Sequence, residues 1–393
     1  MPGSLRFRPP HVAATPEVRW MLLRAFGPVD SAFPETVDPE GALALSRRFE
    51  VSARVAARQG RKRLAAELGE EAAAGFSEDR ARTTGSGLRL VELTREVAGI
   101  AAGLGIPLAL LKFAALEASG LPVAVHRPAC DVDVLAPAGR SRELQDALVA
   151  GGFRPSGLPE PEHQLSTLEH PAGGAVEIHR LLPGVRPDGG ASATFETLER
   201  CGLLLPCESF PGRCFVPTPE AQAAHILVHA LGQHGWWPSS YSLLKMVADL
   251  IDLSREALGP RALSWVEADI SAGEAEAVRR LCERLVAGED LFSRDDAPEA
   301  VLLRHILAGR LDPGYESALR LGLFRAQPSD RPPLLRLARS IAGTLFLTRA
   351  QVDAIYGPPR RPLGYLGRQL ARPFDLLARL GRSGARSLRL RRG

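Results

Sequence analysis

Apolar side chains recur at helical spacing through the first part of the chain. From Pro16 onward they fall every three or four positions, at Val18, Met21, Leu22, Ala25 and Phe26. Residues 41–74, rich in Ala, Leu, Arg and Glu, keep the same period. The pattern predicts a helical region over residues 1–87, in which the glycine-containing stretch 75–87 is expected to be a linker. A further helix is predicted over residues 88–103.

The pattern then changes to short apolar runs, which are typical of buried strands. Strands are predicted at 107–111 and 131–135, and a hairpin at 164–179 whose second strand is Ala175 to His179. Helices are expected between them, the first at 112–119. The alternation of strands and helices suits a sheet with helices packed against it. We predict an α+β fold with a small mixed sheet. Its core at residues 88–182 would lie between helical regions at 1–87 and 183–358.

The region after the core begins with a stretch, 184–216, that is rich in Gly, Pro and small residues and is expected to cross the molecule without regular structure. Thr218-Pro219-Glu220 then predicts a helix start, because it offers a Thr cap, a Pro at the first helical position and an acid in the first turn. Further helices are predicted at 243–253, 257–285 and 300–321.

The composition is that of a soluble globular chain, with 45% hydrophobic residues and a net charge of only +4. This charge is too small to imply nucleic-acid binding by itself. The N-terminus has no apolar run of the signal-peptide kind, and no transmembrane segment is expected. The five cysteines show no zinc-knuckle spacing, so free thiols and a cytoplasmic location are predicted.

Two carboxylates stand out in the strand at 131–135. Successive strand residues point to opposite faces, so Asp131 and Asp133 share one face, roughly 7 Å apart. Like charges at this spacing repel, which indicates a cation between them, although a solvated strand face is the alternative interpretation. Glu177 adds a third carboxylate from a later strand. His179 shares its face, as a site residue or as a hydrogen-bonded structural histidine.

Two basic residues precede these acids. Lys112 falls at a predicted strand-to-helix turn, where helix amides and an ammonium group can hold phosphate together; a surface lysine is the alternative. Arg127 either binds phosphate through its two-pronged guanidinium or neutralises Asp131 or Asp133. The residues do not separate these roles. His163 is a weaker candidate for the same site.

Three further histidines follow in the predicted helix after Thr218. His225 and His229 are four residues apart, a spacing that can bind zinc. However, Ile226 stands where a metalloprotease has its glutamate, and His234 falls on the opposite side of the helix. A helix core or a wall that faces the substrate is therefore favoured over a zinc site.

The order Leu110-Leu111-Lys112, Arg127, Asp131-x-Asp133 and Glu177-x-His179 resembles the nucleotidyltransferase superfamily, and more narrowly the bacterial family of uncharacterised nucleotidyltransferases. The resemblance implies transfer of a nucleotidyl group from an NTP to an unidentified acceptor, which could be a small molecule, a sugar, a peptide or RNA, with release of pyrophosphate. It further implies that catalysis and binding of Mg²⁺ (or Mn²⁺) fall to Asp131, Asp133 and Glu177, and phosphate binding to Lys112 and Arg127. The family members have Gly where this chain has Phe113.

Two other classes of function stay open. The Phe113 departure favours a degenerate, non-catalytic fold that acts as a binding or scaffold protein. The basic tail at 359–393 favours an adaptor, because ten arginines face the single acid Asp375 and apolar residues between Leu363 and Leu380 allow an amphipathic helix. Such a helix would contact a membrane surface or a partner; the alternative is a solvated basic tail.

Overall fold

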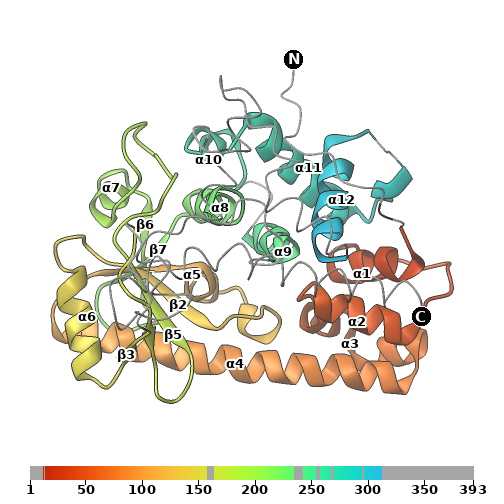
Figure 1. Cartoon of the computed structure of the whole chain (residues 1–393), viewed down its shortest axis with the longest axis horizontal. Helices are drawn as coiled ribbons and strands as arrows, with labels where there is room; N and C mark the ends of the chain where they lie inside the picture. The colour runs from red at the N-terminus through yellow and green to blue at the C-terminus, as the bar shows by residue number, and fades with distance from the viewer. Residues whose placement is uncertain are drawn as a thin grey trace, which may run out of the picture.

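The computed structural model describes residues 12, 14–156, 163–233, 242–253, 257–266, 270–293 and 296–311. In these residues a seven-stranded mixed sheet lies among α-helices, so the predicted α+β class is confirmed (Figure 1). The basic tail at 359–393 lies outside the described residues. No helix in the described ranges is long and apolar enough to cross a membrane.

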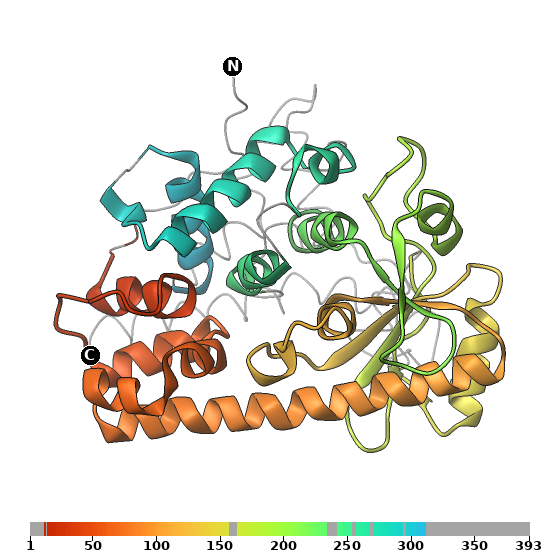
Figure 2. The ribbon, with the colours of Figure 1, turned by 180° about the vertical axis from the view of Figure 1, so that it is seen from behind.

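The chain starts with four helices. They are α1 (Pro16–Phe26), α2 (Pro39–Arg48), α3 (Ser52–Leu68) and α4 (Glu70–Gly103). Side-chain oxygens of Thr15 and Asp38 cap the first two by accepting hydrogen bonds from backbone amides of the first turn. The long helix α4 passes under both the N-terminal helices and the sheet (Figure 2).

The linker predicted at 75–87 is wrong, because α4 runs through it without a break and also crosses the predicted 87/88 boundary. The glycines in this stretch allow neighbouring segments to pack closely against α4. A Cβ at Gly87 would lie 2.4 Å from the carbonyl oxygen of Ala124, and one at Gly75 would lie 2.5 Å from a Leu43 methyl group. Close approach of neighbouring segments therefore explains these glycines, at the usual cost of Gly in a helix.

The sheet has the strand order β3-β4-β5-β2-β1-β7-β6. Its strands are β1 (Leu108–Leu111), β2 (Asp131–Leu135), β3 (Arg154–Pro155), β4 (Leu168–Glu169), β5 (Ala175–His179), β6 (Leu204–Cys207) and β7 (Cys214–Pro217). The central strand β2 pairs antiparallel with β1 and parallel with β5. The strands predicted at 107–111, 131–135 and 175–179 are confirmed.

The prediction for 184–216 is wrong in part, since this stretch forms α7 (Phe195–Arg200), β6 and the start of β7. β7 pairs parallel with β1, and β6 pairs antiparallel with β7 at the edge of the sheet. Pro206 fits there because an edge strand needs fewer backbone donors. The strands are only four residues long, too short to show a period.

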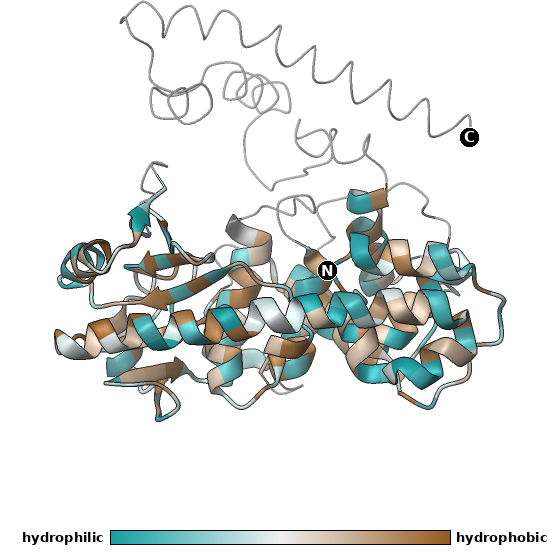
Figure 3. Cartoon of the chain, turned by 90° about the horizontal axis from the view of Figure 1, so that it is seen from below, coloured by the Kyte–Doolittle hydropathy of each residue, from teal (hydrophilic) through white to brown (hydrophobic). Residues whose placement is uncertain are grey.

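Helices cover both faces of the sheet. The face of Val132 and Val134 packs on α4 and α6 (Ser141–Ala150), with Leu93 and Leu144 in the same cluster. Figure 3, seen from the α4 side, shows this helix lying across the molecule. Residues 131 and 133 point to the other face, as strand alternation requires. That face is turned toward the C-terminal helices, and it also carries the end of β1, where α5 (Lys112–Ala118) begins.

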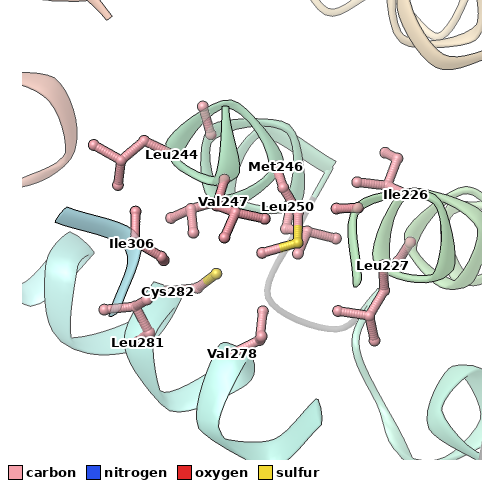
Figure 4. Close-up of a cluster of buried hydrophobic side chains, with 14 of the residues drawn as sticks. Ile226, Leu227, Leu244, Met246, Val247, Leu250, Val278, Leu281, Cys282 and Ile306 are labelled. Carbon is pink, nitrogen blue, oxygen red and sulfur yellow. The ribbon is translucent and has the colours of Figure 1, made fainter. Parts of the chain in front are cut away.

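The C-terminal helices form a layer that shares one apolar core with the N-terminal helices and with one face of the sheet. They are α8 (Pro219–Leu227), its π-helical continuation Val228–Gln233, α9 (Leu243–Leu253), α10 (Pro260–Ser264), α11 (Ala272–Ala287) and α12 (Pro298–Leu311). Figure 4 shows Leu227, Met246, Leu250 and Val278 meeting between α8, α9 and α11. This packing fixes α8 and α9 over the acidic face of the sheet.

Candidate functional site

The candidate site lies where β2 and β5 run side by side. The parallel register places Asp133 opposite Glu177 and Leu135 opposite His179. Since alternate residues share a face, Asp131, Asp133, Glu177 and His179 all point toward the C-terminal helices. The structure thus brings together the four residues that the sequence analysis placed on two separate strands.

The three residues Asp133, Glu177 and His179 form the tightest group. Their oxygen and nitrogen atoms all lie within 4.8 Å of one another, as a metal site requires, and the described residues contain no other such group. Nε2 of His179 lies 2.9 Å from Asp133 Oδ1 and 3.7 Å from Glu177 Oε2. The sequence analysis expected Asp131 in the place that His179 takes; Asp131 lies beside this group, half-buried at the start of β2.

Lys112 closes the buried side of the group. Its Nζ lies 2.7 Å from Asp133 Oδ1, and both side chains are buried. The lysine has a φ of 46°, a left-handed conformation that is costly for a residue with a side chain. Backbone strain of this kind collects at functional sites, since the surrounding structure must hold it in place.

Burial and charge together set the pKa values here. Burial by itself would raise the pKa of Asp133, but the charge of Lys112 and the hydrogen bond from His179 hold it well below its usual range. Burial would lower the pKa of Lys112, yet the charges of Asp133 and Asp131 raise it above the ordinary value. The pair is therefore ionised, and each partner stabilises the other's charge.

The two outer carboxylates lack this compensation. Burial, followed by the charge of Asp133, raises the pKa of Glu177 to about 7. The same two causes raise the pKa of Asp131. The repulsion that Asp131 and Glu177 feel from Asp133 is therefore not fully compensated, and an added cation would relieve it.

Arg127 contacts a different acid from the ones expected. It binds Asp249 of α9 in a two-pronged ion pair, with Nε 2.6 Å from Oδ1 and Nη2 2.9 Å from Oδ2, and both side chains are buried. Its charge also lowers the pKa of Asp131, though less than burial raises it. Arg127 therefore joins the segment before β2 to the helical layer, while staying close enough to act on the acidic site.

The sequence analysis missed Lys245 as a site residue. Lys245 lies one helical turn before Asp249 on the same face of α9, half-buried. Burial, followed by the nearby charge of Arg127, lowers its pKa, and its own charge acts on Asp131 and on exposed Cys130. One signal was present: the chain has only three lysines, Lys62, Lys112 and Lys245, and two of them lie at this site.

Four histidines extend from the metal-ligand group toward α8. The ring of His163 stacks on His179 at 5.9 Å, His179 meets His225 at 6.4 Å, and His225 meets His229 at 6.1 Å between ring centroids. Burial lowers the pKa of His225 to about 3, which keeps its ring neutral. Among the described residues, no group of three metal-ligating side chains includes His225 or His229, and His225 is buried. His234 lies outside the described residues.

Phe113 does not project over the turn at Lys112. Its side chain is 1% exposed and belongs to the apolar core between the sheet and α4, together with Leu110 and Leu116. The Phe113 ring thus packs in the apolar core, and it does not cover the turn at Lys112.

One family model matches more than half of the chain. The model of a family described as "uncharacterised nucleotidyltransferase" matches residues 35–285 of the 393-residue chain. This range contains every site residue discussed above. No curated protein and no solved structure matches the chain.

Proposed function

Because the chain belongs to the family of uncharacterised nucleotidyltransferases, we propose that it moves a nucleotidyl group from an NTP to an acceptor hydroxyl with the help of a divalent metal ion. The observation that carries this proposal is that Asp131, Asp133 and Glu177 share one face of the sheet beside Lys112, whose ammonium group contacts Asp133. This arrangement combines oxygen ligands for a divalent ion with an ammonium group for a phosphate. The acceptor stays open among small molecules, sugars, peptides and RNA.

The donor set fits Mg²⁺ or Mn²⁺. Asp133 and Glu177 present carboxylate oxygens within 4.8 Å of each other, and the raised pKa of Glu177 indicates that negative charge is in excess there. Asp131, on the same face, would add a further carboxylate toward the solvent side. When bound, the ion supplies positive charge that stabilises the triphosphate as its Pα–O bond breaks.

The basic residues then hold the phosphates. Lys112 neutralises Asp133, and it can turn to a phosphate oxygen once another cation takes over that role. Lys245 reaches the site from α9, so the triphosphate would lie between the sheet and the helical layer. Arg127 contributes mainly by fixing α9 through Asp249.

In the transfer step the acceptor oxygen forms a bond to the α-phosphorus. The bond from that phosphorus to the bridging oxygen of the pyrophosphate breaks, and pyrophosphate leaves with the electron pair. Glu177, which lies opposite Asp133 in the sheet, would take the proton of the acceptor hydroxyl.

The test is calorimetric titration of each of the four NTPs in the presence of Mn²⁺. Asp131→Asn/Asp133→Asn should abolish binding, whereas Asp146→Asn, an exposed acid of α6, should bind like the wild type. Equal binding by the double variant would refute a nucleotide site at these carboxylates. Binding by the wild type alone would also identify the base.

The ion pair of Lys112 and Asp133 favours one alternative, a non-catalytic member of the family that binds a partner. In such a protein the lysine would neutralise the carboxylate permanently, with no role for a metal ion. Wild-type protein that binds neither Mn²⁺ nor any NTP would support this alternative.

We place either function in the cytoplasm. This location is supported by the free thiols of Cys207 and Cys214, which are paired residues of β6 and β7.

A further inference from the structure

We propose that Nε2 of His179 is a direct metal ligand, and that this nitrogen makes the site select a first-row transition ion such as Mn²⁺ over Mg²⁺. The inference rests on the proposed metal-dependent function and adds the identity of the ion. The ion would then be bound by Asp133, Glu177 and His179, instead of by the three carboxylates of Asp131, Asp133 and Glu177.

The spacing of the donor atoms supports this set. Two ligand atoms that each lie about 2.1 Å from one ion are about 3.0 Å apart at a right angle and about 3.4 Å apart at the tetrahedral angle. His179 Nε2 lies 2.9 Å from Asp133 Oδ1 and 3.7 Å from Glu177 Oε2. Both distances are close to those that one ion would impose, and the third pair, Asp133 and Glu177, lies within 4.8 Å.

The tautomer of His179 can also change. Its ring is buried, and Nδ1 has no hydrogen-bond partner among the described residues. In the hydrogen bond to the ionised Asp133, Nε2 carries the proton. Because Nδ1 has no described partner, the proton can move to Nδ1 when an ion binds, which leaves the lone pair of Nε2 for the ion. The neighbouring His225, whose Nε2 likewise lacks a partner, stays neutral and does not repel a cation.

Ligand chemistry then favours a transition ion. Mg²⁺ demands oxygen ligands in near-ideal octahedral geometry and keeps several waters, whereas imidazole binds first-row transition ions well. In this group one of the three side-chain ligands is an imidazole, and its neighbours are the packed rings of His163 and His225. Mg²⁺ would have to bind without the His179 contact or accept a poor ligand.

The experiment uses the full chain and Mn²⁺ or Mg²⁺ alone, without nucleotide. Calorimetry should show Mn²⁺ binding at least about tenfold tighter than Mg²⁺. Pulsed electron paramagnetic resonance of the bound Mn²⁺ should show coupling to one directly bound ¹⁴N nucleus. His179→Gln should remove this coupling and weaken Mn²⁺ binding by about 10- to 100-fold.

Two further variants guard the interpretation. His170→Gln is the matched control, because this histidine lies in the turn after β4 beside Glu96 of α4, and it should keep the ¹⁴N coupling. His179→Asp retains a ligand oxygen, so it should bind Mn²⁺ without ¹⁴N coupling and reduce the preference for Mn²⁺ to less than about threefold. This variant tests the idea even where His179→Gln fails to fold.

The outcomes separate this inference from the proposed function. Mn²⁺ that binds the wild type with oxygen ligands only, or a ¹⁴N coupling that survives in His179→Gln and His179→Asp, would overturn the role of His179 and leave a metal-dependent transferase. Absence of any divalent ion binding by the wild type would overturn both.

Discussion

The ion pair of Arg127 and Asp249 offers the sharpest test of how the site is held. Both side chains are nearly inaccessible, 6% and 1% exposed, and they share two hydrogen bonds of 2.6 and 2.9 Å. Asp249→Leu or Arg127→Met would break this buried ion pair, which costs about 3–5 kcal/mol of unfolding free energy. The double variant Arg127→Met/Asp249→Leu removes both charges, so it should recover most of that loss.

Urea denaturation of the wild type, the two single variants and the double variant measures this coupling directly. The same four proteins are then titrated with Mn²⁺ and an NTP. We expect nucleotide affinity to fall in both single variants and to return in large part in the double variant, because Arg127 acts by positioning α9. The reasoning is refuted by a stable Arg127→Met protein that has lost nucleotide binding while Asp249→Leu retains it, since Arg127 would then bind phosphate itself.

Three further predictions concern the site and its surroundings. Lys112→Met and Lys245→Met should each weaken the binding of Mn²⁺-tripolyphosphate by at least about tenfold in calorimetry, because a hydrogen bond to a charged group contributes about 1.5–3 kcal/mol. Lys62→Met, at an exposed position, should bind like the wild type. Equal affinity in all three variants would contradict the phosphate role of Lys112 and Lys245. Mn²⁺ affinity should rise with pH up to about 7, because the pKa of Glu177 is raised from 4.5 to about 7 and its carboxyl must lose a proton to bind the ion. For the same reason the metal-free fold should lose stability as pH rises from 4.5 through 7, and Glu177→Gln should flatten both profiles. Phe113→Ala should lower the free energy of unfolding by about 3–5 kcal/mol in urea denaturation, because the ring fills the core. NTP binding should not become tighter. Tighter binding would show that the Phe113 ring hinders the nucleotide at the turn.

Much of the central sheet was predictable because its strands carry their own signal. In Asp131 to Leu135 and in Val176 to His179 the polar and apolar residues alternate with a period of two, which fixes both the strand and the face of each side chain. The alternation alone therefore assigns Glu177 and His179 to one face. The actual distances depend on the register between β2 and β5, which short strands do not reveal.

The errors have a common origin in contacts between distant segments. Gly75 and Gly87 are helix breakers by local preference, and only the neighbours Leu43 and Ala124 show why α4 accepts them. Lys245 likewise follows the β2 acids by more than a hundred residues, and a lone lysine in an apolar helix carries no local functional pattern. Such residues become visible when the packing of α9 over the sheet is known.

The face of α9 that carries Lys245 also contacts the N-terminal helices and the segment before β2. Asp252, one turn beyond Asp249, accepts hydrogen bonds of 2.7 and 2.8 Å from Arg54 of α3 and lies 3.1 Å from Nε2 of His126. Burial opposes ionisation of Asp252, but the bonds from His126 and Arg54 lower its pKa to about 2. Asp249 in turn holds Arg127. The N-terminal helices, the segment before β2 and the C-terminal layer are therefore connected through one helix, and a core fragment of residues 88–182 would lack Lys245 and these ion pairs.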